Sequence, residues 1–98
     1  MPNLTIRPIE PKDWNAWRGL WRAYLEFYET TVADEIFETT FKRLCDPKIS
    51  NQNGMLAVVD DVPVGLVHYI FHPHNWKVEE VCYLQDLYAD PSVRGTGV

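Results

Sequence analysis

The chain has 98 residues, of which 46% are hydrophobic and 13% aromatic. This composition suits one packed domain and argues against a disordered segment. Nine basic against fourteen acidic residues give a net charge of −5, which disfavours a nucleic-acid surface and weakly favours a cationic partner. Because no apolar run approaches the roughly eighteen residues of a membrane helix and no signal-peptide pattern opens the chain, we expect a cytoplasmic protein with no membrane partner.

The first third of the chain predicts a strand followed by a helix. Residues 4–9 alternate apolar and polar side chains, which predicts a short strand with Leu4, Ile6 and Ile9 pointing inward. Asp13 is a plausible N-cap for a helix that runs to about Glu29. One face of this helix carries side chains at three-and-four spacing that we interpret as core: Trp14, Trp17, Trp21, Tyr24, Leu25 and Tyr28.

A second helix and a hairpin are predicted next. Asp34 is expected to cap the second helix, and Asp46 before Pro47 ends it because the residue before a proline avoids the helical region. Residues 48–54 are polar and predict a surface loop. Two runs rich in β-branched and aromatic residues, 55–59 and 64–71, predict an antiparallel hairpin, with a loop over residues 72–77.

The most informative stretch is the last sixteen residues. Residues 83–89 predict a buried strand that stops at Asp90 and Pro91, and the loop after it contains Arg94, Gly95 and Gly97. Two glycines around one small residue allow backbone N–H groups to converge, which makes a cradle for an anion such as a phosphate. A dinucleotide-binding unit is disfavoured because the loop has no third glycine in register and follows a hairpin.

This stretch resembles the acetyl-CoA motif of the GCN5-related N-acetyltransferases (GNAT), which is written Arg/Gln-x-x-Gly-x-Gly/Ala. Arg94 and Gly97 match it, and the final position of the motif would be residue 99. The resemblance implies an α+β fold with a mostly antiparallel sheet in the order strand, helix, helix, strand, strand, strand, and with helices on both faces. The residues expected to bind acetyl-CoA are Leu87, Tyr88, Ala89, Arg94, Gly95, Thr96, Gly97 and Val98.

Asp86 is the candidate for acid–base chemistry. It is the only charged residue between Tyr83 and Ala89, and a carboxylate among apolar side chains is costly unless it is hydrogen-bonded or paired. Two interpretations stay open: a structural hydrogen bond, or a proton acceptor for an amine. His68 is more typical of a satisfied core or edge histidine than of a base, and His72 and His74 diverge around a proline, so we expect no metal.

The segment before the motif is similar to the spermidine/spermine, thialysine and fungal histone/polyamine acetyltransferase groups. Those polyamine enzymes carry Glu-Asp where this chain has Gln85 and Asp86. Because glutamine replaces the glutamate, the resemblance implies Asp86 as the base in preference to Gln85. The turn between the first two helices lines the acceptor groove in the family. The resemblance therefore implies Tyr24, Tyr28 and Glu29 as acceptor-binding residues.

We therefore expect an N-acetyltransferase that moves acetyl from acetyl-CoA to a polyamine, a lysine-like small amine or a basic peptide. The alternative is a non-catalytic domain that keeps the fold for CoA binding or protein association. We also expect these residues to be the N-terminal half of a longer single domain. A chain ending at Val98 would leave one edge of strand 83–89 unpaired and Leu84, Leu87 and Tyr88 partly uncovered, and such an edge recruits a second copy, so a homodimer is expected.

Overall fold

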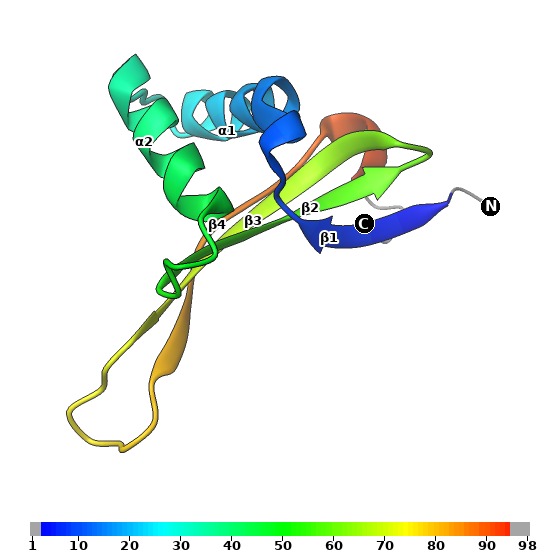
Figure 1. Cartoon of the computed structure of the whole chain (residues 1–98). Helices are drawn as coiled ribbons and strands as arrows, with labels where there is room; N and C mark the ends of the chain where they lie inside the picture. The colour runs from blue at the N-terminus through cyan, green and yellow to red at the C-terminus, as the bar shows by residue number, and fades with distance from the viewer. Residues whose placement is uncertain (1–2, 95–98) are drawn as a thin grey trace.

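Two helices lie across one face of a four-stranded sheet (Figure 1). The computed structural model describes residues 3–94. The sheet has the order β1-β2-β3-β4, and every neighbouring pair is antiparallel. The predicted α+β order is therefore confirmed. Its elements are β1 (Leu4–Pro8), η1 (Pro11–Asp13), α1 (Trp14–Phe27), α2 (Asp34–Cys45), β2 (Gln52–Val59), β3 (Val62–His72), β4 (Val81–Ala89) and η2 (Pro91–Val93).

The core fills the space between the helices and the sheet. Trp17 of α1, Phe37 of α2 and Leu56 of β2 are almost completely inaccessible to solvent. Trp17 contacts Trp21, with ring centroids 5.2 Å apart, and Phe41, with centroids 5.1 Å apart. The aromatic face predicted for the first helix is thus mainly packing, and it holds α1 against both α2 and the sheet.

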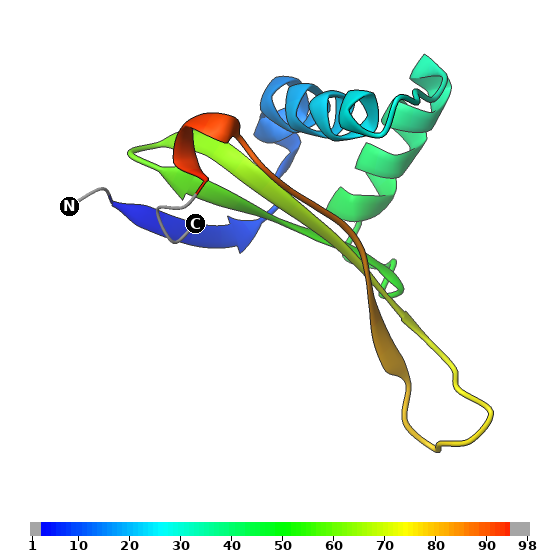
Figure 2. The ribbon, with the colours of Figure 1, turned by 180° about the vertical axis from the view of Figure 1, so that it is seen from behind.

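The sheet face away from the helices is uncovered in residues 3–94, as Figures 1 and 2 show from opposite sides. Leu4 is 42% and Ile6 55% exposed, whereas Ile9 is buried. The prediction that Leu4 and Ile6 point inward was wrong, because both helices pack on the other face and alternate residues of β1 turn toward the bare one. The helices that the resemblance implied on both faces are found on one face among the described residues.

The end of α1 differs from its prediction. The helix stops at Phe27, and Glu29 adopts a left-handed conformation with φ 55°. The N–H of Thr30 donates to the carbonyl of Leu25 (3.0 Å), and the N–H of Glu29 donates to the carbonyl of Glu26 (2.9 Å). This is a Schellman motif. It turns the chain early and leaves Tyr28, predicted to be core, 62% exposed.

Neither predicted helix cap acts through its own side chain. The buried carboxylate of Asp13 accepts two hydrogen bonds from Arg7 (2.7 and 2.9 Å) and one from the N–H of Glu10 (2.8 Å). Asp34 is the first residue of α2, with Ala33 at the N-cap, and its carboxylate pairs with Arg18 (3.1 Å). Both aspartates have a guanidinium partner, so they fix the helix starts through ion pairs.

The strands are longer than predicted. Gln52 to Gly54, predicted as loop, pair with Ile70 to His68 and extend β2. Asp60 and Asp61 both have positive φ (49° and 67°), which identifies a two-residue turn of the primed type that suits the twist of a hairpin. The β3–β4 connection projects from the body as an arm (Figures 1 and 2). Neither helix in the described part of the chain is long and apolar enough to span a membrane.

Candidate active site

An irregularity in β4 brings two consecutive polar residues to one side. His68 of β3 pairs with Asp86, but its neighbour Tyr69 pairs with Leu84, so Gln85 is an extra residue without a partner in the ladder. This is a β-bulge, which re-aims side chains that would otherwise alternate across the strand. Gln85 and Asp86 consequently line the same pocket.

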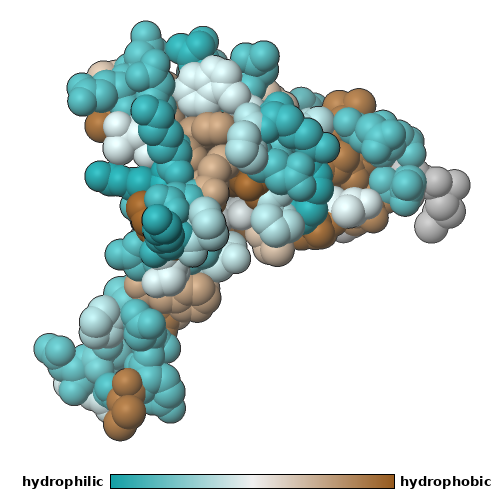
Figure 3. Space-filling view, in the orientation of Figure 1, coloured by the Kyte–Doolittle hydropathy of each residue, from teal (hydrophilic) through white to brown (hydrophobic). Residues whose placement is uncertain are grey.

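This pocket, which we call the bulge pocket, has a volume of about 230 Å³ and lies between the helices and the sheet. Among the described residues that line it, Asp86 is the only one with a carboxylate and none is a lysine or an arginine. Hydrophilic side chains cover most of the outer surface of the two helices (Figure 3). Its lining residues are Trp21, Val32, Ile36, Thr40, Leu44, Gln52, Asn53, His68, Tyr69, Ile70, Gln85 and Asp86.

Asp86 is held from the neighbouring strand. Its Oδ2 lies 2.8 Å from Nδ1 of His68, and the side chains of the two residues are 12% and 6% exposed. On the other side of the imidazole, Nε1 of Trp17 donates to Nε2 of His68 at 2.9 Å. His68 is therefore the satisfied core histidine that the sequence indicated, and the hydrogen bond expected for a buried Asp86 comes from His68.

Tyr24 approaches the same carboxylate from α1. Burial of the hydroxyl, followed by its hydrogen bond to Asp86 and the charge of Asp86, raises the pKa of Tyr24 to about 12. The phenol therefore stays protonated at neutral pH and acts as a donor to Asp86. Since Tyr28 packs on Tyr24 with ring centroids 5.0 Å apart, the two tyrosines form a short aromatic wall beside the site.

The end of β4 supplies the region predicted to bind the cofactor. The only strand paired with β4 in residues 3–94 is β3, so its outer backbone N–H and C=O groups face away from the sheet. The N–H of Asp90 donates to the carbonyl of Val64 (2.7 Å), which closes the strand. Nε of Arg94 donates to the carbonyl of Ala89 (2.9 Å), and its guanidinium lies 5.3 Å from the centre of the Tyr88 ring.

Part of the predicted cofactor loop lies outside the described residues. Gly95, Thr96, Gly97 and Val98 all fall there. Leu87 is 66% and Leu84 55% exposed, as predicted for an uncovered β4. Asp90 accepts hydrogen bonds from Ser92, which hold the pKa of its carboxyl below the usual value. The turn after β4 is thus fixed in geometry before the loop begins.

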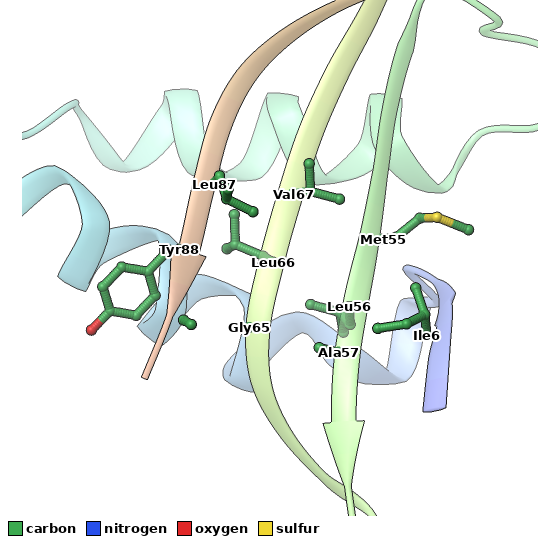
Figure 4. Close-up of a pocket in the computed structure, with 10 residues that line it drawn as sticks. Ile6, Met55, Leu56, Ala57, Gly65, Leu66, Val67, Leu87 and Tyr88 are labelled. Atoms are coloured by element: carbon green, nitrogen blue, oxygen red, sulfur yellow. The ribbon is translucent and has the colours of Figure 1, made fainter. Parts of the chain in front are cut away.

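A second, smaller hollow lies on the uncovered sheet face (Figure 4). Its volume is about 130 Å³, and its lining is apolar, with Ile6, Met55, Val67 and Leu87 among its residues. None of its described lining side chains is charged, and the phenol of Tyr88 is the only polar side-chain group among them. The hollow is therefore an apolar packing surface, whereas the polar side chains of the bulge pocket lie on the helix side of the sheet.

The predicted acceptor residues are only partly brought together. Tyr24 is hydrogen-bonded to Asp86, whereas Tyr28 and Glu29 are exposed at the end of α1, and none of the three is among the residues that line the bulge pocket. Sequence reasoning missed Trp17 as a partner of His68, and it missed the amides of Gln52 and Asn53. The one sequence signal for this contact was the presence of His68 in an apolar strand. Residue spacing could not identify Trp17 as its partner, because the two residues are 51 positions apart. In residues 3–94, no three histidine, cysteine or acidic side chains gather as metal ligands.

An antiparallel sheet crossed by two helices, with the sequence Arg-x-x-Gly after a bulged fourth strand, agrees with the fold that the resemblance to N-acetyltransferases implied. The family model described as "Acetyltransferase (GNAT) family" matches residues 14–98. The chain belongs to this family, as the resemblance implied.

Among characterised proteins, the chain is similar to "D-amino-acid N-acetyltransferase HPA3" of Saccharomyces cerevisiae, with 39% identity over 97 residues. The match covers 97% of this chain and 60% of that protein. Among solved structures, the aminoglycoside N-acetyltransferase AAC(6')-Iy in complex with a bisubstrate analogue superimposes with a TM-score of 0.81 at 19% identity, over 98% of this chain and 63% of the other. The same enzyme with CoA gives a TM-score of 0.81 over 100% and 62%. The chain thus spans about three-fifths of the length of the proteins it matches.

Proposed function

We propose that this chain forms the acceptor and cofactor-loop part of an acetyl-CoA-dependent N-acetyltransferase that acts on a primary amine. One observation carries the proposal. The bulge of β4 turns the carboxylate of Asp86 into a pocket without lysine or arginine in its described lining, three residues before the strand end at Ala89. A proton acceptor and a candidate thioester-binding backbone therefore belong to one strand.

The proposed reaction begins with loss of a proton from the amine. An alkyl ammonium has a pKa near 10, so at neutral pH it must be deprotonated before its nitrogen can attack. Asp86 accepts this proton directly or through a water molecule, and its negative charge also attracts the cation. The nitrogen then forms a bond to the carbonyl carbon of the thioester, the C–S bond breaks, and the CoA thiolate leaves. The nitrogen loses a second proton as the amide forms, and the thiolate takes up this proton directly or through water.

The end of β4 is proposed to hold the acetyl donor. Outward N–H groups between Leu87 and Ala89 would bind the pantetheine arm and polarise the thioester carbonyl. Polarisation of this kind lowers the activation free energy by about 3 to 4 kcal/mol. The pyrophosphate is assigned to Arg94 and to residues 95–98, on the strength of the Arg-x-x-Gly match. The related enzyme solved with CoA supports acetyl-CoA as the cosubstrate.

The proposed acceptor is a small amine that enters as a cation. The bulge pocket supports this, because its one carboxylate suits an ammonium and its amides, from Gln52, Asn53 and Gln85, suit polar substituents. The yeast relative is named for D-amino acids, so amino acids belong in the acceptor panel beside polyamines, lysine analogues and basic peptides. A homodimer is also part of the proposal, and Leu84, which is 55% exposed in the described chain, is a candidate contact.

The test is acetyl transfer by the full-length protein, followed as release of free CoA thiol. The panel contains spermidine, lysine, D-amino acids, a basic peptide and a neutral aromatic amine. We expect a cationic amine to be the best acceptor, and added salt to raise its KM because exposed charges are screened over about 10 Å. A neutral aromatic amine that outperforms every cation would contradict the acceptor class.

The competing function is a non-catalytic domain that binds CoA or another protein. It shares the fold and the cofactor loop, so calorimetric titration with CoA has to accompany the activity assay. Binding of CoA with no transfer to any member of the panel would favour this alternative. Sedimentation at several concentrations reports the dimer separately.

A further inference from the structure

The contact between Trp17 and His68 fixes where the histidine carries its proton. An indole N–H can only donate a hydrogen bond, so Nε2 of His68, 2.9 Å away, must accept and carries no hydrogen. A neutral imidazole has one protonated nitrogen, which is then Nδ1. This Nδ1 faces Oδ2 of Asp86 at 2.8 Å, and the geometry therefore makes His68 a donor to the carboxylate.

Burial makes this arrangement rigid. Trp17 is 0% and His68 5% exposed, and the ring of His68 packs against both Trp17 and Trp21, with centroids 5.9 and 5.4 Å away. Loss of either hydrogen bond would leave a polar atom without a partner in the core, which costs about 1 to 3 kcal/mol. The imidazole thus has one favoured tautomer and one favoured orientation.

We propose that Trp17 and His68 are positioning residues that act through Asp86, as a chain of two hydrogen bonds from helix α1 across β3 to the base on β4. His68 holds Oδ2 and fixes the plane of the carboxylate. An ionised carboxylate has about four lone-pair sites, so the donors His68 and Tyr24 leave acceptor capacity for an incoming ammonium. This inference rests on the proposed function for its kinetic part, whereas the hydrogen-bond chain stands on the geometry alone.

The hydrogen-bond chain can be tested without measuring turnover. In protein labelled with ¹⁵N-histidine, NMR distinguishes a protonated ring nitrogen from a bare one. We expect His68 to show a protonated Nδ1 and a bare Nε2. The exposed His72 can show the same pattern, because its Nδ1 lies 2.9 Å from the carbonyl oxygen of Pro73, so the pair of signals that His68→Gln removes is the one assigned to His68. Trp17→Phe keeps an aromatic ring at position 17 but removes the indole N–H that donates to Nε2 of His68. The ring-nitrogen signals of His68 should therefore change. A protonated Nε2 on His68 in the wild-type protein would overturn the chain.

Kinetics of the full-length protein test the positioning role. His68→Leu removes both hydrogen bonds and should lower kcat by about tenfold to a hundredfold with little change in KM, because the base remains but is misplaced. His68→Gln keeps one amide donor and one carbonyl acceptor, and we expect it to recover most of the loss. Circular dichroism and thermal melting verify that each variant is folded.

The outcomes separate the two proposals. Wild-type kcat in a folded His68→Leu protein would overturn the positioning role, and so would equal losses in the His68→Leu and His68→Gln proteins. If the wild-type protein transfers acetyl to no amine, the proposed function fails, and the positioning role fails with it. The NMR result would then still decide whether the hydrogen-bond chain exists.

Discussion

Gly54 of β2 lies directly opposite His68 of β3. A Cβ atom at Gly54 would lie 2.5 Å from Cδ1 of Ile9 and 3.3 Å from Cδ2 of His68. The missing side chain therefore makes room first for Ile9 and then for the imidazole of His68.

Gly54→Ala should accordingly destabilise the protein by about 1 to 3 kcal/mol through overpacking, and it should shift the ring signals of His68. Urea denaturation and NMR measure the two effects. Gly19→Ala is the matched control, because a Cβ there meets nothing within 4 Å and a helical glycine costs about 1 kcal/mol relative to alanine. If the Gly54→Ala protein were as stable as the Gly19→Ala protein, the steric argument would be contradicted.

Asp86→Asn should lower turnover of the full-length protein by about two orders of magnitude or more, as expected for loss of a general base. Steady-state acetyl transfer with the best amine of the panel is the measurement. Asp34→Asn, at a side chain that is 80% exposed and paired with Arg18, is the control and should change turnover little. Unchanged turnover in a folded Asp86→Asn protein would remove Asp86 from the mechanism.

Tyr24 should make the protein less stable at high pH. Its pKa is about 12 in the folded state and about 10 in an unfolded chain, so the unfolded state ionises first. The stability that the partly buried phenol contributes is present below pH ~10 and is lost as the pH rises toward 12. Tyr24→Phe should therefore lose less stability than the wild-type protein between pH 10 and 12, measured by urea denaturation.

The matched variant for Tyr24 is Tyr28→Phe, which removes an exposed phenol from the same aromatic wall. Ultraviolet titration of the wild-type protein should contain a phenol that ionises late, and the Tyr24→Phe protein should lack it. Persistence of this late phenol in the Tyr24→Phe protein, or its loss in the Tyr28→Phe protein, would show that the assignment to Tyr24 is wrong.

Asp13 should make the protein sensitive to acid. The two hydrogen bonds from Arg7 hold the pKa of the Asp13 carboxyl below its usual value, so its contribution is present above pH ~3.9 and lost as the pH falls through the lower folded value. Asp13→Asn should cost about 2 to 3 kcal/mol at pH 7, and this difference from the wild-type protein should shrink below pH ~4. A difference that stays constant from neutral pH into the acid range would point to packing instead of charge.

Glu29 has a strained backbone and is one of the predicted acceptor-binding residues, and two substitutions separate these properties. A left-handed φ of 55° costs a non-glycine residue about 1 kcal/mol or more, so Glu29→Gly should raise the free energy of unfolding by about 0.5 to 1 kcal/mol. Glu29→Ala keeps the strain and is the control for loss of the carboxylate. If both variants raise KM for the amine, the carboxylate binds the acceptor, and if neither does, its predicted role there is wrong.

The sequence was sufficient to predict the order of the elements, because apolar spacing reports which residues share a face. It misplaced Leu4 and Ile6, since alternation identifies two faces of a strand but not which one the helices cover. It selected Asp86 as a candidate because it is a charge in an apolar strand, and the structure places this carboxylate in the bulge pocket, whereas its catalytic role stays a prediction. The bulge at Gln85 stayed hidden, because an extra residue in a ladder is defined by the partner strand and leaves no mark in local composition.

The tryptophan–histidine contact also bears on how this protein folds. Trp17 and His68 are 51 residues apart, and His68 and Asp86 are 18 apart, so neither bond can form within one local element. Loop-closure entropy opposes such distant contacts, and the native tautomer of His68 is acquired only when α1 docks on the finished β3–β4 ladder. The imidazole signal therefore reports that α1 has docked on the sheet, and the β3–β4 hairpin made as a separate peptide should lack it.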